Sequence, residues 1–162
     1  MTVAANQGFY DFGAGDPAPR NTGTTVTVPG ASAVGSVATG VEAVIEHCAE
    51  LTRSLDGVLA VIVATSDGML IHSTWSEVEG MRAAAISAAA LGLGQRIAAD
   101  FGQGGFHDSV VSTGDRVIGI YAVGERHVLG VVAAAEDVTL GLLHLSARKT
   151  ARAVGTALAA AR

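Results

Sequence analysis

Cysteine, lysine and aromatic residues are scarce in this chain of 162 residues, and each scarcity excludes a class of site or partner. With one cysteine, Cys48, the chain can form no internal disulfide and has no paired-cysteine zinc site, which is typical of a reducing compartment. There is one lysine, Lys149, and the formal net charge is −5. The basic clusters that neutralise nucleic-acid phosphates are therefore missing, and we expect no nucleic-acid partner.

Long apolar runs are missing as well. The longest ones, such as residues 128–135, are far too short to cross a bilayer, and no basic region followed by an apolar segment stands at the N-terminus. We therefore expect a cytoplasmic protein that does not insert into membranes. Hydrophobic residues make up 49% of the chain but aromatics only 4%, so the core must be built from small and branched aliphatic side chains.

All three prolines lie in the first 40 residues, which are rich in Gly, Thr and Ala and show little periodic apolar pattern. We predict a flexible tail over residues 1–40 and a single domain over 41–162. The tail contains an aromatic cluster, Phe9, Tyr10 and Phe12. This cluster is either a short docking segment or, as we favour, an incidental feature of the leader.

Apolar spacing and turn residues downstream of the tail predict three helices and five strands. Ser76 and Glu79 form a capping-box pattern, and Asp67-Gly68 is a typical hairpin turn. The second and third strands are half polar and are expected at the sheet edges, whereas the other three are apolar at nearly every position and so have both faces covered. The expected helices span about 41–55, 76–100 and 139–161, and the expected strands 58–64, 69–74, 106–113, 116–123 and 127–134.

Short segments at both ends of this pattern resemble the roadblock family. Leu55-Asp56-Gly57-Val58, followed by Ser66-Asp67-Gly68-Met69-Leu70, looks like the opening of a roadblock domain, and residues 131–142 are similar to its last strand, acidic turn and Leu-Gly helix start. The resemblance covers about 41–161. It implies an α+β fold with a five-stranded antiparallel sheet in the order 2-1-5-4-3, the first and last helices on one face and the second on the other.

The resemblance also implies a function: a non-enzymatic homodimeric module that binds and regulates a small Ras-like GTPase. The Ala-rich, Arg-over-Lys composition is similar to that of bacteria with GC-rich genomes, in which roadblock proteins resemble components of GTPase and sensor-kinase modules. Two alternatives stay open, a dimeric scaffold for other protein partners, like the dynein-associated roadblock proteins, and, less favoured, a small-molecule sensor. No cofactor is implied.

Residues that suggest catalysis or anion binding do not assemble into a recognised motif. The five histidines are scattered without the i, i+4 spacing of a helical metal site. The glycine-rich segment 102–105 runs from a helix into a strand, opposite to a phosphate loop, and is predicted to be a helix cap in which Gly adopts the left-handed conformation. Arg148, Lys149 and Arg152 are interpreted as a solvated helix face. We therefore expect no catalytic residue, cofactor site or metal site.

The small-residue surface of the Ala- and Gly-rich second helix is a plain core contact, a helix–helix dimer seam or a platform for another protein, and these interpretations do not exclude one another. Glycine costs a helix about 1 kcal/mol relative to Ala, so a closely packed neighbour is expected to compensate. We expect Met81, Ile86, Leu93 and Ile97 to cover the sheet, leaving a smooth face that meets a second copy beside the edge strand at 106–113. The predicted dimer and partner interface comprises Ala84, Ala88, Leu91, Gly92, Gln95, Phe106, Asp108, Val110 and Ser112.

Overall fold

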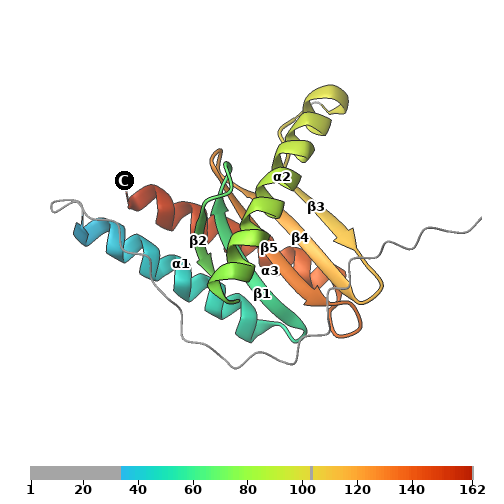
Figure 1. Ribbon diagram of the computed structural model, residues 1–162, viewed down its shortest axis with the longest axis horizontal. Helices are drawn as coiled ribbons and strands as arrows, with labels where there is room; N and C mark the ends of the chain where they lie inside the picture. Colours follow the sequence, from blue (N-terminus) through green and yellow to red (C-terminus); the bar gives the residue numbers. More distant parts are fainter. Residues whose placement is uncertain (1–33, 103, 162) are drawn as a thin grey trace, which may run out of the picture.

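The computed structural model describes residues 34–102 and 104–161, in which three helices and five strands are found (Figure 1). The strands form one sheet in the order β2-β1-β5-β4-β3, and every neighbouring pair is antiparallel. The predicted fold is therefore confirmed. In chain order the elements are α1 (Val34–Ser54), β1 (Val58–Thr65), β2 (Leu70–Ser73), α2 (Glu77–Phe101), β3 (Asp108–Ser112), β4 (Arg116–Val123), β5 (His127–Ala134) and α3 (Leu140–Ala160).

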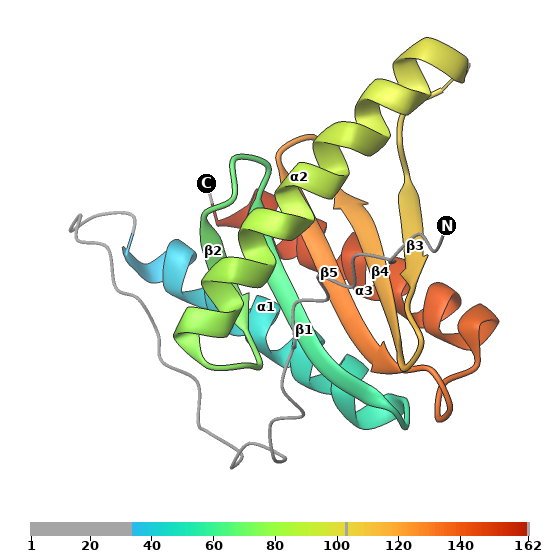
Figure 2. The ribbon, with the colours of Figure 1, turned by 45° about the vertical axis from the view of Figure 1, so that its right-hand side comes forward.

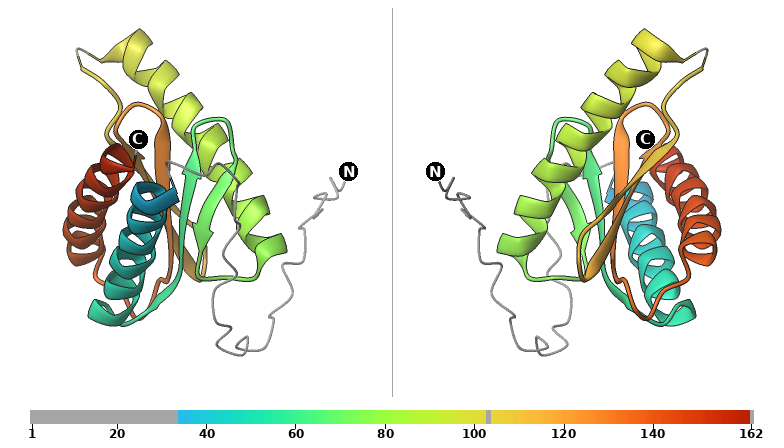
Figure 3. Two further views of the ribbon diagram at one scale, coloured as in Figure 1. Left: turned by 90° about the vertical axis from the view of Figure 1, so that its left-hand side faces the viewer. Right: turned by 90° about the vertical axis from the view of Figure 1, so that its right-hand side faces the viewer.

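The helices cover the two faces of the sheet unequally. Helices α1 and α3 lie side by side on one face, and α2 crosses the other face alone (Figures 2 and 3). The face under α1 and α3 buries larger side chains, among them Leu51, Tyr121 and Leu143. The face under α2 holds a smaller cluster around Ile62, Leu91 and Ile120.

The central and edge strands differ in burial as their sequences predict. Strands β1, β4 and β5 are buried at most positions because helices cover both of their faces. Strands β2 and β3, which carry more polar residues, are at most partly buried. Each of them has a strand neighbour on one side only, so one row of backbone N–H and C=O groups is left without a ladder partner.

Two of the predicted local signals act as expected. The Ser76 hydroxyl accepts a hydrogen bond from the backbone N–H of Glu79 at 3.4 Å and donates one to the Glu79 carboxylate at 2.7 Å, which begins α2. Gly68, in the turn between β1 and β2, has φ of +91°, and Gly57, which ends the turn after α1, has φ of +81°. Both angles lie in the region that only glycine adopts at little cost.

Two predictions near the element ends are wrong. Helix α1 begins at Val34, whereas the expected helix begins at about residue 41. The expected start was too late because Gly40 is unfavourable inside a helix. In the structure a Cβ at Gly40 would lie 2.3 Å from the Cβ of Ala161, so a glycine fits this close contact. Gly102 is extended, with φ of −105°, and not left-handed; a Cβ there would lie 2.8 Å from the carbonyl oxygen of Ala98. The aromatic cluster at residues 9–12 lies outside the described residues.

Candidate interaction surface

The large apolar side chains of α2 point away from the sheet. Met81, Ile86, Leu93 and Ile97 are 50%, 56%, 63% and 51% exposed, so the prediction that they cover the sheet is wrong. The buried face of the helix is made instead of small residues and one leucine: Gly80, Ala84, Ser87, Ala88, Leu91 and Gly94. Helix α2 is thus turned so that its larger side chains are available to a partner.

Close approach of α2 to the sheet explains why small residues face inward. A Cβ at Gly130 of β5 would lie 2.6 Å from the Ser87 hydroxyl, so the helix and the strand meet where both carry little side chain. Hydrophobicity alone assigns the largest side chains to the core. Here the short distance between the layers leaves no room for them, because protein interiors are close-packed and a residue that exceeds its space forces strain.

Two of the three glycines within α2 have the close neighbours that we expected. A Cβ at Gly94 would lie 2.2 Å from the Phe106 ring, and one at Gly80 would lie 2.7 Å from the Cβ of Ser73. At Gly92 nothing lies within 4 Å, so no contact within the described chain compensates for this glycine. The contact between Gly94 and Phe106 therefore packs the C-terminal half of α2 against the segment that leads into β3.

The outward side of α2 carries large apolar side chains together with the exposed Arg82 and Arg96, and we call the apolar set the α2 outer face. Ile86, Leu93 and Ile97 recur at seven- and four-residue spacing and so follow one another along the helix. Exposed large apolar residues that gather on one face mark an interaction site more often than single ones do. The α2 outer face consists of Val78, Met81, Ile86, Leu93 and Ile97.

The predicted interface residues are divided between the core and the surface. Ala84, Ala88 and Leu91 are 0%, 8% and 1% exposed and lie beneath α2, so assigning them to an interface was wrong. Helical spacing grouped them correctly on one face, but that face is the one that covers the sheet. The other predicted residues lie at or near the surface: Gly92, Gln95 and Ser112 are exposed, and Phe106, Asp108 and Val110 are partly buried.

Asp108 belongs to a polar cluster that connects β3 with α3. The Arg148 guanidinium donates a hydrogen bond from Nε to Oδ2 of Asp108 at 2.8 Å, and its second nitrogen lies 2.7 Å from the same oxygen. Nε2 of His144 lies 3.7 Å from Oδ1. Because Asp108 and Arg148 are 40 residues apart in the chain, no local pattern indicated the pair. Arg148 is therefore more than a solvated residue on a helix face.

Tyr121 on β4 lies directly opposite Asp108 and is 1% exposed. Burial, with a smaller contribution from the negative charge of Asp108, raises the pKa of its hydroxyl to about 12, so the group is neutral at physiological pH. The ring lies over Gly119, where a Cβ would stand 2.6 Å from one ring carbon, and its centroid is 5.7 Å from that of His144. The buried hydroxyl has no hydrogen-bond partner in the described part of the chain, so Tyr121 meets the cluster through its ring, and the sequence did not indicate this.

Among residues 34–102 and 104–161, no three His, Cys, Asp or Glu side chains gather closely enough to hold a metal ion. None of the helices in this part of the chain is long and apolar enough to cross a membrane. The features that stand out are thus the α2 outer face, the free edge of β3 and the Asp108 cluster.

Solved structures with this topology come from several bacteria. A Roadblock/LC7 domain from Streptomyces avermitilis superposes with a TM-score of 0.67 at 17% identity, over 70% of this chain and 96% of that one. MglB from Myxococcus xanthus superposes with a TM-score of 0.64 at 20% identity, over 72% of this chain and 94% of that one. The gliding protein MglB from Thermus thermophilus superposes with a TM-score of 0.65 at 17% identity, over 82% of this chain and 95% of that one. No protein of curated function matches this chain in sequence.

Sequence comparison agrees with the superpositions. The family model of the Roadblock/LC7 domain matches residues 44–133, from the middle of α1 to the end of β5. This range contains the whole sheet apart from the last residue of β5, together with the helix that carries the α2 outer face. Helix order, sheet order and the matched sequence therefore agree that the chain belongs to the Roadblock/LC7 domain family.

Proposed function

We propose that this protein is a homodimeric, non-enzymatic module that binds a small Ras-like GTPase and regulates its nucleotide cycle in the cytoplasm. Membership of the roadblock family supports the proposal, as does the structural similarity to two MglB proteins. The observation that carries it is the α2 outer face. A helix that buries alanine and exposes isoleucine and leucine is built to meet another protein.

The free edge of β3 supports the homodimer. Pairing this edge with the same edge of a second copy would satisfy its backbone groups in an antiparallel, two-fold arrangement. Phe106, packed on Gly94, holds the C-terminal half of α2 beside the start of β3. Leu93 and Ile97 would then lie next to the paired strands and form the second layer of the interface with Val110 and Ser112. The N-terminal part of the α2 outer face, Val78, Met81 and Ile86, would remain for the GTPase.

The dimer is tested with a charge on the α2 outer face. We expect Leu93→Glu to weaken dimerisation at least tenfold in sedimentation velocity, because a buried carboxylate without a partner is costly. Leu145→Glu is the matched control: Leu145 is 69% exposed on α3, on the opposite side of the sheet. An unchanged dimer in Leu93→Glu, with its circular dichroism spectrum intact, would contradict this interface.

The GTPase partner is tested separately. Full-length protein is immobilised and incubated with extract of the native cell that contains either GDP or a non-hydrolysable GTP analogue. It should retain a Ras-like GTPase in one nucleotide state more than in the other. The isolated GTPase should then bind the purified protein with the same preference, and Ile86→Glu should remove this binding. Capture of other proteins without nucleotide dependence would favour the scaffold function instead. The protein alone should hydrolyse neither GTP nor ATP.

A further inference from the structure

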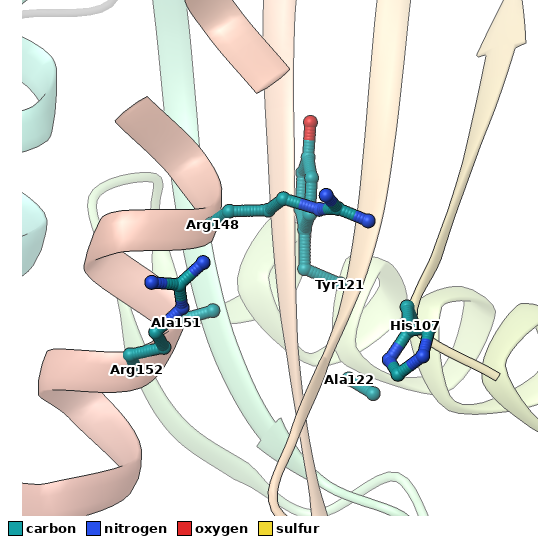
Figure 4. A pocket seen from close by; sticks show the side chains of 6 residues that line it. All are labelled: His107, Tyr121, Ala122, Arg148, Ala151 and Arg152. Atoms are coloured by element: carbon teal, nitrogen blue, oxygen red, sulfur yellow. The ribbon is translucent and has the colours of Figure 1, made fainter. Parts of the chain in front are cut away.

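A cleft of about 390 Å³ opens between the beginning of β3 and helix α3 (Figure 4). Tyr121 and Ala151, which are both buried, lie at its floor. Three basic side chains stand around it, Arg148 and Arg152 from α3 and His107 from the segment before β3. The volume is within the range of small-molecule sites, which is about 300–1,000 Å³. The lining residues are His107, Tyr121, Ala122, Arg148, Ala151 and Arg152.

The charge around this cleft is opposite to that of the whole protein, whose formal net charge is −5. Asp108 neutralises Arg148 but contacts only two of the three guanidinium nitrogens of Arg148. Because a guanidinium has five N–H donors, some donors of Arg148 are not used by Asp108. The Arg152 guanidinium forms no ion pair within the part of the chain that the structure describes, and the side chain is exposed. Donors on both arginines therefore remain for an anion.

The placement of basic groups on two sides of the cleft favours an anion with several oxygens. In Figure 4 Arg148 and Arg152 extend from α3, and His107 lies on the other side of the cleft, beyond Tyr121. A tetrahedral oxyanion presents oxygens in three directions at once, whereas a carboxylate presents two oxygens in one plane. Guanidinium groups match the oxygens of phosphate well because they can donate two parallel hydrogen bonds.

We propose that this cleft binds the phosphate group of a small phosphomonoester. Arg148 and Arg152 hold the phosphate oxygens from one side and His107 holds one from the other, while the organic part of the ligand extends toward solvent. Asp108 positions Arg148 for this contact. The cleft lies on the α3 side of the sheet, opposite to α2, so the proposal does not depend on the GTPase.

The test is a calorimetric and NMR titration of the full chain with inorganic phosphate and with glycerol 3-phosphate at constant ionic strength. Both should bind saturably, and Arg152→Gln should weaken binding at least tenfold. Lys149→Gln is the matched control, since Lys149 loses the same charge on the same helix but does not line the cleft, and it should change the affinity by less than twofold. Circular dichroism checks that both variants fold.

Three results would overturn the proposal. The first is the absence of saturable binding at millimolar phosphate. The second is an equal loss of affinity in Arg152→Gln and Lys149→Gln, which would mean that only the overall charge attracts the anion. The third is binding of succinate as tight as that of phosphate, because a dicarboxylate of the same charge lacks the tetrahedral arrangement of oxygens.

Discussion

The two faces of the sheet are packed in opposite ways. Under α1 and α3 the protein buries large side chains such as Leu51, Tyr121 and Leu143, which are 2%, 1% and 0% exposed. Under α2 most of the residues that the helix buries are small, and its isoleucines and leucine at 86, 93 and 97 remain in solvent. The face under α1 and α3 therefore supplies most of the hydrophobic stabilisation, whereas α2 combines a thin core with a surface suited to a partner.

A large cavity on the α1–α3 face should have the greatest effect on stability. Replacing Leu143, which is fully buried, by Ala should lower the free energy of unfolding by about 2–5 kcal/mol in urea denaturation, because the side chain leaves a cavity among packed neighbours. Leu145→Ala, on the exposed side of the same helix, should change it by less than about 0.5 kcal/mol. If Leu143→Ala and Leu145→Ala lowered the free energy of unfolding equally, Leu143 would not be packed between α3 and the sheet.

Alkaline pH should destabilise the face under α1 and α3, because this face contains the buried thiol of Cys48. Burial raises the pKa of its thiol from 9.0 to about 12. The neutral thiol is therefore favoured in the folded protein, and the stability that it contributes is complete below pH 9 and is lost as the pH rises toward 12. The loss should be about 1.4 kcal/mol per pH unit in this window.

Urea denaturation at pH 8, 9.5 and 10.5 measures this loss against Cys48→Ala. The variant should start less stable at pH 8, because its core is smaller, but should fall less steeply with pH than the natural chain. Parallel pH profiles of the two proteins would mean that the thiol is not buried as described. Ionisation of other groups contributes equally to both profiles and cancels in the difference.

The smallest expected effect distinguishes glycines that differ in their surroundings. Gly94→Ala should destabilise the protein by about 1 kcal/mol net, since a Cβ 2.2 Å from Phe106 must displace the ring and helix propensity offsets only part of that strain. Gly141→Ala, in the first turn of α3 with nothing within 4 Å, should stabilise the protein by up to about 1 kcal/mol. Thermal unfolding of both variants provides the measurement, and stabilisation by Gly94→Ala would contradict the packing of Phe106.

Local chemistry made most of the fold predictable. The turn glycines, the Ser76 cap and the apolar character of β1, β4 and β5 each depend on neighbours within a few residues, so a single sequence can show them. The start of α1 was missed for the complementary reason. Gly40 resembles a helix breaker locally, but it lies where Ala161, the residue after α3, leaves no room for a Cβ.

The site was less predictable because its residues are brought together from distant parts of the chain. The Asp108–Arg148 pair and the cleft beside it depend on how α3 crosses the sheet, which no spacing in the sequence reports. Three of the α2 residues predicted for the interface, Ala84, Ala88 and Leu91, face the sheet. Among the predicted residues, those of β3 and the exposed Gly92 and Gln95 remain candidates for the dimer contact.

The sequence by itself determined the order of the elements, the antiparallel sheet and the absence of disulfides, because periodicity, turn residues and cysteine number are properties of the chain alone. The tertiary structure decided which side of α2 faces the sheet. Helical periodicity shows that a helix has distinct faces, but the choice between them depends on the distance to the neighbouring layer. Here Gly130 and Ser87 set that distance short, so alanine is inside and isoleucine is outside.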